Sequence, residues 1–372
     1  MSEDTDFIDE TNSCYARWVV ERAWDWYRRH PWLCGFNYVP STAINPIELW
    51  DADTFDARAI KRELGWAKDL GFNALRVNLH YYAWEADPAN LNTRIAKFLD
   101  IAAGHGLSVM PCLFDDCSHN GKQPHHGKQD EPVPGVHNSG WTPSPGHALV
   151  VDEVRWPLLA AYVTETIEAF RDDPRILLWD LYNEPGNGNM GEKSLPLLRE
   201  TFNWAREANP AQPISSGLWI GDTSVVDPDT LNGFMATQSD VVTFHNYSEH
   251  DPLLAQVRQL KTFGRPVICT EWMRRPISRF EANLEVFRDE GVGCFFWGLI
   301  NGKSQTQFPW GSPVGAPEPD PWFHDLLRRD GSPYLSAETA YVREFIVDVR
   351  RAEAAEKAKR EVKNAKRRKP SA

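Results

Sequence analysis

Residues 176–185 read ILLWDLYNEP, an apolar run that ends in the polar pair Asn183 and Glu184. Strands that are apolar at almost every position are typical of a parallel sheet covered on both faces. The chain repeats this kind of run at seven other places, namely residues 33–38, 74–79, 107–114, 214–220, 241–245, 267–270 and 293–297. We therefore expect eight buried parallel strands.

Amphipathic stretches separate these runs. Residues 55–70 and 278–291 place apolar side chains at spacings of three and four, which is typical of a helix with one buried face. Gly71, Gly106 and Gly291 stand where such helices would end. A repeated strand–helix order requires parallel pairing with right-handed crossovers, and eight such units close into a barrel. The predicted fold class is α/β, a single-domain (β/α)8 TIM barrel.

The predicted barrel occupies residues 32–348 of the 372. Residues 1–31 are expected to form a helical extension whose helix, at 16–29, packs on the barrel floor. Residues 349–372 are expected to form a basic helix or tail, because ten Lys/Arg and three Glu from 350 onward give a charge of +7. We interpret this end as a solvated helix, with RNA or membrane tethering as the alternative, and assign it no function.

Two long segments interrupt the regular alternation. Residues 117–147 are rich in Pro, Gly, His and Asn, and residues 301–333 hold Gly, Pro and Trp. They follow the third and eighth predicted strands at their carboxyl ends, where barrel enzymes build their sites. Long loops at these places would wall off the cleft and favour a short pocket over an open groove.

The composition excludes several classes of protein. Hydrophobic residues make up 42% and charged residues 25% of the chain, as in ordinary soluble domains. No stretch reaches the roughly 18 apolar residues that a membrane helix needs, and the acidic start differs from a secretory signal. We therefore expect no membrane partner and a cytoplasmic location. The net charge of −12 argues against nucleic-acid binding, and nothing in the sequence predicts an oligomeric state.

The cysteines predict neither a disulfide framework nor a zinc site. They are few for this length and four lie in the apolar runs, so we expect small core residues in a reducing compartment. The six are Cys14, Cys34, Cys112, Cys117, Cys269 and Cys294. The chain also holds 16 tryptophans, an excess that is expected where the flat faces of sugars stack on indole rings.

Two glutamates stand at the ends of predicted strands. Glu184 ends the fourth and Glu271 the seventh, so both lie at the barrel mouth on opposite walls. Hydrolysis of a glycosidic bond needs one carboxylic acid to protonate the departing oxygen and one carboxylate to attack or stabilise the anomeric carbon. Each glutamate alone has an ordinary alternative, as a helix cap or a solvated group. Together they predict a glycosidase.

At these residues the sequence resembles the clan A retaining glycoside hydrolases, most closely the cellulase-like family 5. Asn183-Glu184-Pro185 and Glu271 match the family signature, and the resemblance covers about residues 32–297. It implies that Glu184 is the acid/base, that Glu271 is the nucleophile and that Asn183 binds the sugar 2-hydroxyl. It also implies retention of anomeric configuration, for which the two carboxyl groups must lie about 5 to 5.5 Å apart.

Lesser motifs match in order along the chain. Arg76 is similar to the family's second-strand arginine that keeps the nucleophile ionised, and Trp297 to the eighth-strand platform under the cleaved sugar. His245 and Tyr247 resemble the sixth-strand pair in which the histidine lines the substrate site and the tyrosine hydrogen-bonds the nucleophile. Arg76 and Tyr247 should lower the pKa of Glu271. Glu184, with no evident cationic neighbour and close to another carboxylate, should have a raised pKa.

The end of the third strand departs from the family pattern. Where many members have a histidine, this chain has Asp115 and Asp116. We expect an acidic residue to contact the outer hydroxyls of the sugar there, with capping of the following turn as the alternative. Asn37, together with Trp297 and the two aspartates, is expected to form the pocket floor.

Nearly half of the histidines lie in the loop after the third strand, and we expect them to bind sugar or loop backbone. They are His119, His125, His126, His137 and His147. A zinc site is the alternative, but no ligand spacing completes a set, so no metal or other cofactor is predicted. Trp141 is expected to bring an indole over the cleft, as could Trp310, Trp50 or Trp84, which have loop packing as their alternative.

The sequence thus predicts a retaining β-glycoside hydrolase with a carbohydrate substrate, a β-linked oligosaccharide or glycoconjugate. Loop length favours exo action on a gluco- or manno-configured sugar. The alternatives are an endo-β-1,4-glucanase, mannanase or xylanase and, in another class, a catalytically silent carbohydrate-binding barrel or a metal-dependent barrel hydrolase.

Overall fold

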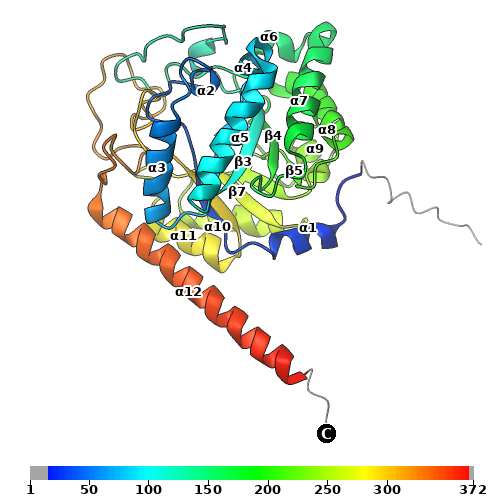
Figure 1. Cartoon of the computed structure of the whole chain (residues 1–372), viewed down its shortest axis with the longest axis vertical. Helices are drawn as coiled ribbons and strands as arrows, with labels where there is room; N and C mark the ends of the chain where they lie inside the picture. The colour runs from blue at the N-terminus through cyan, green and yellow to red at the C-terminus, as the bar shows by residue number, and fades with distance from the viewer. Residues whose placement is uncertain (1–15, 368–372) are drawn as a thin grey trace, which may run out of the picture.

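Eight parallel strands form the centre of the protein in the computed structural model, which describes residues 16–367 and side chains up to residue 361 (Figure 1). Cys14 and the outer parts of both predicted terminal segments, residues 1–15 and 368–372, lie outside the described residues. The strands are β1 (Cys34–Asn37), β2 (Ala74–Asn78), β3 (Ser108–Asp115), β4 (Trp179–Asn183), β5 (Ile214–Ser215), β6 (Val242–His245), β7 (Val267–Trp272) and β8 (Gly293–Trp297). Each lies within or next to a predicted run.

The strands pair in the order β5-β4-β3-β2-β1-β8-β7-β6. A single parallel bridge between Leu218, which follows β5, and Phe244 of β6 closes the ring. The predicted run 214–220 is a regular strand only over two residues. Beyond Ser215 the regular pairing with β4 ends and side chains make the contacts instead: the Ser216 hydroxyl donates to the carbonyl of Tyr182, and the Trp219 indole donates to the carbonyl of Pro185. The fold is the predicted (β/α)8 barrel.

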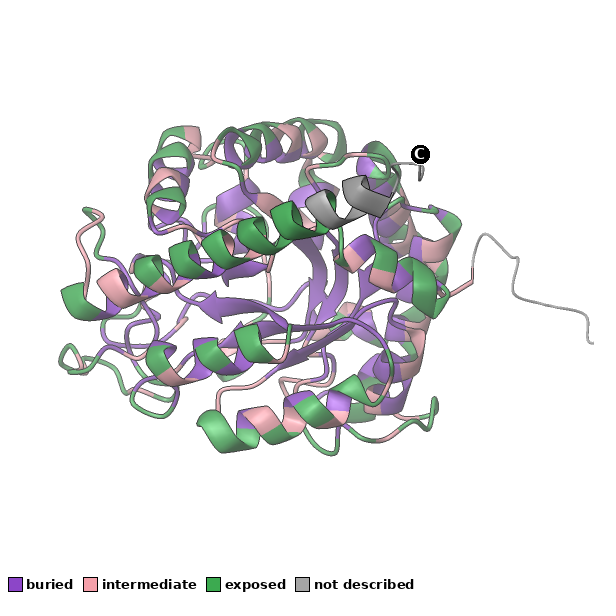
Figure 2. Ribbon diagram, turned by 90° about the horizontal axis from the view of Figure 1, so that it is seen from below, coloured by how far each residue is buried: buried purple, intermediate pink, exposed green. Residues whose placement is uncertain are grey.

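Helices surround the strands, with their apolar faces inward and their polar faces toward solvent (Figure 2). They are α1 (Val20–Tyr27), α2 (Pro46–Trp50), α3 (Ala57–Asp69), α4 (Tyr81–Ala86), α5 (Pro88–Gly104), α6 (His147–Val150), α7 (Trp156–Phe170), α8 (Leu195–Glu207), α9 (Leu231–Gln238), α10 (His250–Lys261), α11 (Phe280–Asp289) and α12 (Ser336–Arg367), with 3-10 turns at His119–Gly121, Glu153–Arg155 and Gly191–Ser194. Gly71, Gly106 and Gly291 follow α3, α5 and α11 with positive φ angles, as their positions predict.

The barrel interior is layered. Its lower layer is apolar and packs on α1, which lies beneath the strands (Figure 1). This layer consists of Leu33, Ala74, Met110, Leu177, Leu178, Val241, Ile268 and Phe295, and Ala23 and Trp26 of α1 pack against it together with Trp18. A Cβ at Gly35 would lie 2.8 Å from the Phe295 ring and 2.4 Å from the carbonyl of Ala74, so only glycine fits beside that ring. The floor is therefore closed.

The C-terminal helix α12 runs without a break through the predicted boundary at residue 348. Val342, Ile346 and Val349 are buried, whereas almost every described side chain beyond them is exposed. Figure 1 shows this part of α12 projecting from the barrel. Within residues 16–367 no helix combines the length and apolar character needed to cross a membrane.

Candidate active site

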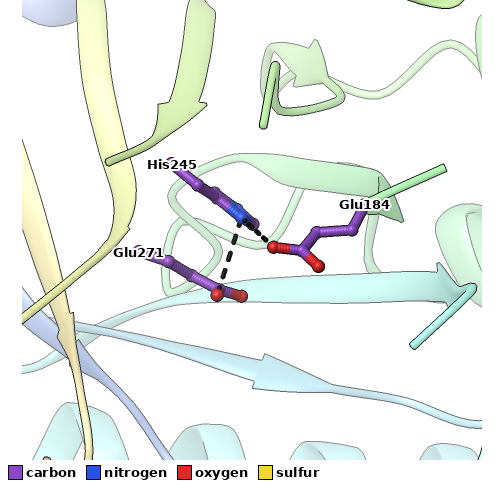
Figure 3. Close-up of side chains that lie close together, drawn as sticks. All are labelled: Glu184, His245 and Glu271. Carbon is purple, nitrogen blue, oxygen red and sulfur yellow. Dashed lines mark hydrogen bonds and ion pairs between the residues drawn. The ribbon is translucent and has the colours of Figure 1, made fainter. Parts of the chain in front are cut away.

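Glu184 and Glu271 meet at the carboxyl mouth of the barrel, on either side of His245 (Figure 3). Glu184 directly follows β4, Glu271 is the fifth residue of β7, and His245 ends β6. One carboxylate oxygen of each glutamate and a ring nitrogen of His245 all lie within 4.8 Å of one another. This spacing fits double displacement, in which one carboxylate attacks the anomeric carbon and the other carboxyl group protonates the adjacent glycosidic oxygen, rather than the wider gap that inverting enzymes need for a water molecule.

Glu271 is held by a cation and a hydroxyl. Arg76 Nη1 lies 2.8 Å from its Oε1, and the Tyr247 hydroxyl donates to its Oε2 at 2.8 Å. Arg76 is fully buried, and its Nε pairs with Asp180 Oδ2 at 2.7 Å, which fixes the plane of the guanidinium. Strand β2 thus supplies one charge that two carboxylates share.

Glu184 is held by three donors of a different kind. His245 Nδ1 lies 2.9 Å from its Oε1, while Asn187 Nδ2 donates to Oε2 at 2.6 Å and Cys117 Sγ lies 3.1 Å from Oε2. Its backbone has a φ of 43°, which is uncommon for a residue with a Cβ. Strain of this kind is found where a surrounding structure fixes a functional side chain.

The order of the two carboxyl pKa values differs from the sequence-based prediction. Burial raises the pKa of Glu271, and the charges of His245 and Arg76 only partly oppose it. Burial also acts on Glu184, but the hydrogen bond and charge of His245, with Cys117 and Asn187, hold its pKa below the ordinary value. The prediction was wrong because it found no cationic neighbour for Glu184. The partner is His245, whose pKa is raised by the charges of Glu271 and Glu184 in spite of burial.

Two predicted binding residues act behind the pocket wall. Arg76 and Asn37 are buried and do not line the cavity. Asn37 Oδ1 accepts from Arg76 Nη1 at 2.9 Å, and its Nδ2 donates to the carbonyl of Thr270 at 2.8 Å. Asn183 does line the cavity, with its Oδ1 accepting from Arg76 Nη2 at 2.6 Å. The prediction of Asn37 as pocket floor is therefore corrected, since it supports Arg76 instead.

The prediction that Asp115 and Asp116 contact sugar hydroxyls is also wrong in this structure, because both are buried and neither lines the cavity. Asp115 accepts from Asn183 Nδ2 (2.9 Å), from the Trp141 indole (2.7 Å) and from the Cys117 amide (2.7 Å). Asp116 accepts from the Tyr182 hydroxyl and the amide of Gly186. The two aspartates therefore fix the wall of the site. This role is close to the turn capping that was the alternative prediction for them.

The cavity above the two glutamates has a volume of about 780 Å³. Of the predicted residues, His137, Trp141, Asn183, Glu184, His245, Tyr247, Glu271 and Trp297 line it. The Trp141 and Trp297 rings meet edge to face at 5.8 Å, and Trp310 lies against Tyr247. Trp50 and Trp84 pack in the core away from the cavity, as expected from the alternative in which they serve packing and not substrate binding.

The histidines of the third loop do not gather around one point. His119 and His137 line the cavity, His126 pairs with Glu85, and His147 bonds the carbonyl of Asp116. Among the described residues, the one trio with metal-like spacing is Glu184, His245 and Glu271. Arg76, Tyr247 and Asn187 donate to these same carboxylates, an arrangement that holds anions through hydrogen bonds.

Sequence reasoning missed several residues of the site. Cys117 and Asn187 contact Glu184, Asp180 orients Arg76, and Arg274 and His324 line the cavity. Of these residues, only Asp180 could have been recognised from the sequence, because a charged residue inside an apolar strand needs a buried partner. The others lie on loops, whose course the strand pattern does not determine.

Comparison with known proteins defines the class. A family model described as "Cellulase (glycosyl hydrolase family 5)" matches residues 42–303. The chain belongs to this family of retaining glycoside hydrolases, which act on O-glycosyl bonds. The search of curated proteins gave no match.

Solved structures share the barrel at low sequence identity. A GH5_18 protein from Streptomyces cattleya in complex with GlcNAc is 17% identical, with a TM-score of 0.60 over 86% of this chain and 81% of the other. The exo-β-1,4-mannosidase Op5Man5 from Opitutaceae bacterium strain TAV5 is 20% identical, with a TM-score of 0.60 over 86% of this chain and 60% of the other. An endo-β-1,4-mannanase from Thermotoga petrophila is 15% identical, with a TM-score of 0.55 over 86% and 77%. At these identities the likeness shows a shared fold.

Proposed function

We propose that this glycoside hydrolase is a β-glycosidase that removes gluco- or manno-configured sugars from the ends of β-linked oligosaccharides or glycoconjugates. The proposal rests on a row of hydrogen bonds that joins the loops 117–147 and 301–333. We call this row the seam, and it walls one side of the pocket. Its relatives by fold include an exo-mannosidase and an endo-mannanase. The choice between end-on and internal cleavage therefore rests on the loops of this chain.

The seam is built from main-chain and side-chain hydrogen bonds. The Asn138 amide donates to the carbonyl of Ser304 at 2.8 Å, and the Gly315 amide donates to the carbonyl of Pro134 at 2.8 Å. Gln305 joins both sides of the seam. Its Oε1 accepts from the Gly135 amide at 3.0 Å and its Nε2 donates to a carbonyl of the first loop at 2.7 Å.

Two histidines line the cavity beside this seam. His137 Nδ1 lies 2.7 Å from the carbonyl of Phe308, and His324 Nδ1 contacts the carbonyl of Met273. Because a carbonyl only accepts, each ring carries its proton on Nδ1 and keeps Nε2 as an acceptor. Burial lowers the pKa of His137 to about 4 and that of His324 well below its ordinary value, so both rings stay neutral. A neutral wall of acceptors suits sugar hydroxyls.

In the first step Glu271 attacks the anomeric carbon while Glu184 protonates the departing oxygen, which gives a glycosyl-enzyme. In the second step the Glu184 carboxylate takes a proton from water, the water oxygen attacks the same carbon, and Glu271 is released. His245 Nδ1, 2.9 Å from Glu184 Oε1, holds a proton one hydrogen bond away from the acid. The site can therefore protonate the leaving group although the pKa of Glu184 is low.

The end-on mode is tested with β-1,4-linked gluco- and manno-oligosaccharides labelled at the reducing end. We expect monosaccharide from the opposite end as the first product, with little fall in the viscosity of the matching polymer. A rapid fall in viscosity with internal fragments would support an endo-acting enzyme. Activity that EDTA abolishes would point to the metal-dependent alternative.

A loop variant tests whether the seam causes this behaviour. Gln305→Ala removes the side chain that joins the two loops, and we expect it to increase the rate on longer chains relative to a disaccharide. The matched control is Gln238→Ala, at the floor end of α9. Equal chain-length profiles for the parent and Gln305→Ala would contradict the role given to the seam.

A further inference from the structure

A cysteine lies beside the proposed acid/base. Cys117 follows β3, and its amide donates to Asp115 Oδ1 at 2.7 Å, which fixes the first residue of the loop against the barrel. Its Sγ lines the cavity and lies 3.1 Å from Glu184 Oε2. The other free cysteines among the described residues are buried in strands, away from the cavity.

The contacts of the sulfur determine where its proton points. The amide groups of Asn183 and Asn187 both donate to Cys117 Sγ at 3.4 Å. With these two donors on its lone pairs, the thiol can direct its S–H only to an acceptor. The Asp115 carboxylate is near the sulfur as well, and Glu184 Oε2 is the acceptor that it contacts at 3.1 Å. Burial and the charges of Asp115, Glu184 and Glu271 raise the pKa of Cys117 well above its ordinary value, so the sulfur keeps its proton.

We propose that Cys117 is a positioning residue for Glu184, whose thiol donates a hydrogen bond to Oε2 and favours the carboxylate form of the acid/base. This rests on the role of Glu184 proposed above. The contact orients the carboxyl group in the free enzyme and again in the second step, when the carboxylate accepts the proton of water. A hydrogen bond to the charged form of an acid lowers its affinity for protons.

Other charged and titratable groups face the same carboxyl. His245 approaches Oε1 from β6, Glu271 lies across the pocket on β7, and Asp115 lies behind Cys117 on β3. Because these groups titrate together, a pH profile reports the set and not Glu184 alone. Removal of the thiol changes one donor and leaves the others in place, so the difference between variant and parent isolates its effect.

The test compares Cys117→Ser with Cys117→Ala and Cys117→Val, measuring kcat/KM against pH on an aryl β-glycoside. Serine keeps a donor, whereas alanine and valine do not. We expect both non-donor variants to move the basic limb of the profile upward by about 0.5 to 1 unit, because a donor to the charged form is lost. Cys117→Ser should retain a basic limb near that of the parent.

Substrates with different leaving groups provide a second readout. We expect Cys117→Ala to lose about three- to ten-fold in kcat on a poor alkyl leaving group, which needs a well-oriented acid, and less on a dinitrophenyl group. The control Cys34→Ala removes a buried thiol whose sulfur lies 4.0 Å from that of Cys294 in the barrel wall, and its profile should match the parent.

Two outcomes would overturn the inference: an unshifted basic limb in both non-donor variants, or the same shift in Cys117→Ser. Glu184→Gln distinguishes this from failure of the proposed function. If Glu184→Gln keeps full activity, the acid/base assignment is wrong. If Glu184→Gln is inactive and the Cys117 variants behave as the parent, only the role of Cys117 is wrong.

Discussion

The two ends of the barrel hold buried carboxylates in opposite ways. At the floor, Asp240 is fully buried and every acceptor position has a partner. Arg206 binds both of its oxygens at 2.8 Å, and the amides of Trp18 and Ile214 donate at 2.8 and 2.9 Å. At the mouth, Glu184 and Glu271 share His245, and Arg76 is divided between Glu271 and Asp180. A carboxylate whose hydrogen-bond positions are all filled stabilises the fold, whereas carboxylates that compete for the same donors can exchange protons with them.

The largest expected effect is at the mouth. Glu271→Gln removes the proposed nucleophile, and we expect kcat/KM to fall by about 10⁴-fold or more. The thermal unfolding midpoint should stay close to that of the parent, because the neutral amide ends the competition for Arg76. Stopped assays on an aryl β-glycoside give the rate, and calorimetry gives the midpoint.

The role itself is tested by chemical rescue. Azide added to Glu271→Ala should restore turnover and give a glycosyl azide of inverted configuration, because the anion replaces the nucleophile. An azide product of retained configuration would show instead that Glu271 is not the attacking group.

Glu184→Gln should have the next largest effect. We expect a loss of about 10² to 10⁴-fold on substrates with poor leaving groups, and a smaller loss on dinitrophenyl glycosides whose leaving group needs little protonation. The dependence of kcat on leaving-group pKa measures this difference. Equal losses across the series would place the role of Glu184 elsewhere.

Asp240→Asn should lower stability and leave activity nearly unchanged, which is the reverse of the effect expected for Glu271→Gln. Breaking a buried ion pair leaves the Arg206 charge without its partner, and we expect the free energy of unfolding to fall by about 3 kcal/mol. Activity per folded molecule should stay within about two-fold of the parent, because Asp240 lies at the far end of the barrel from the cavity. Urea unfolding and active-site titration measure the two quantities. A large loss of specific activity would break the division between floor and mouth.

The smallest expected effect concerns another buried acid, Asp325. Asp325 lies in the last loop, and burial raises its pKa to about 7, with the Thr306 hydroxyl and Arg275 opposing. Between its ordinary value of 3.8 and about 7, the folded state holds a proton that the unfolded state has lost. The stability due to this group is therefore complete at low pH and falls as the pH rises through that window.

Asp325→Asn cannot ionise and should flatten this decline. We expect the difference in free energy of unfolding between variant and parent to shift in favour of the variant, by at most about 2.7 kcal/mol, from pH 5 to pH 8, since about two pH units of this window lie below the folded-state pKa. Urea unfolding at the two pH values measures the shift, and the exposed Asp53→Asn is the control. A shift of opposite sign would mean that the fold stabilises the ionised form of Asp325.

The strands and the placement of the two glutamates could be predicted from the sequence, because burial on both faces and strand ends leave a pattern in the chain. The order of the carboxyl pKa values could not. It depends on how Cys117 and Asn187 fold back from loops and on the positive φ of Glu184, which places its carboxyl beside His245. Asp115 illustrates the same limit, since its acidic character was evident but its burial behind Trp141 was not.

The closed floor beneath the catalytic layer has a kinetic consequence. With α1 sealing the lower end, the departing alcohol and the incoming water must both pass through the mouth of the barrel. A glycosyl-enzyme formed in the pocket therefore reacts with the molecules that enter through this mouth. Added sugars or short alcohols should therefore compete with water for it, so the protein should build glycosides as well as break them when acceptors are abundant.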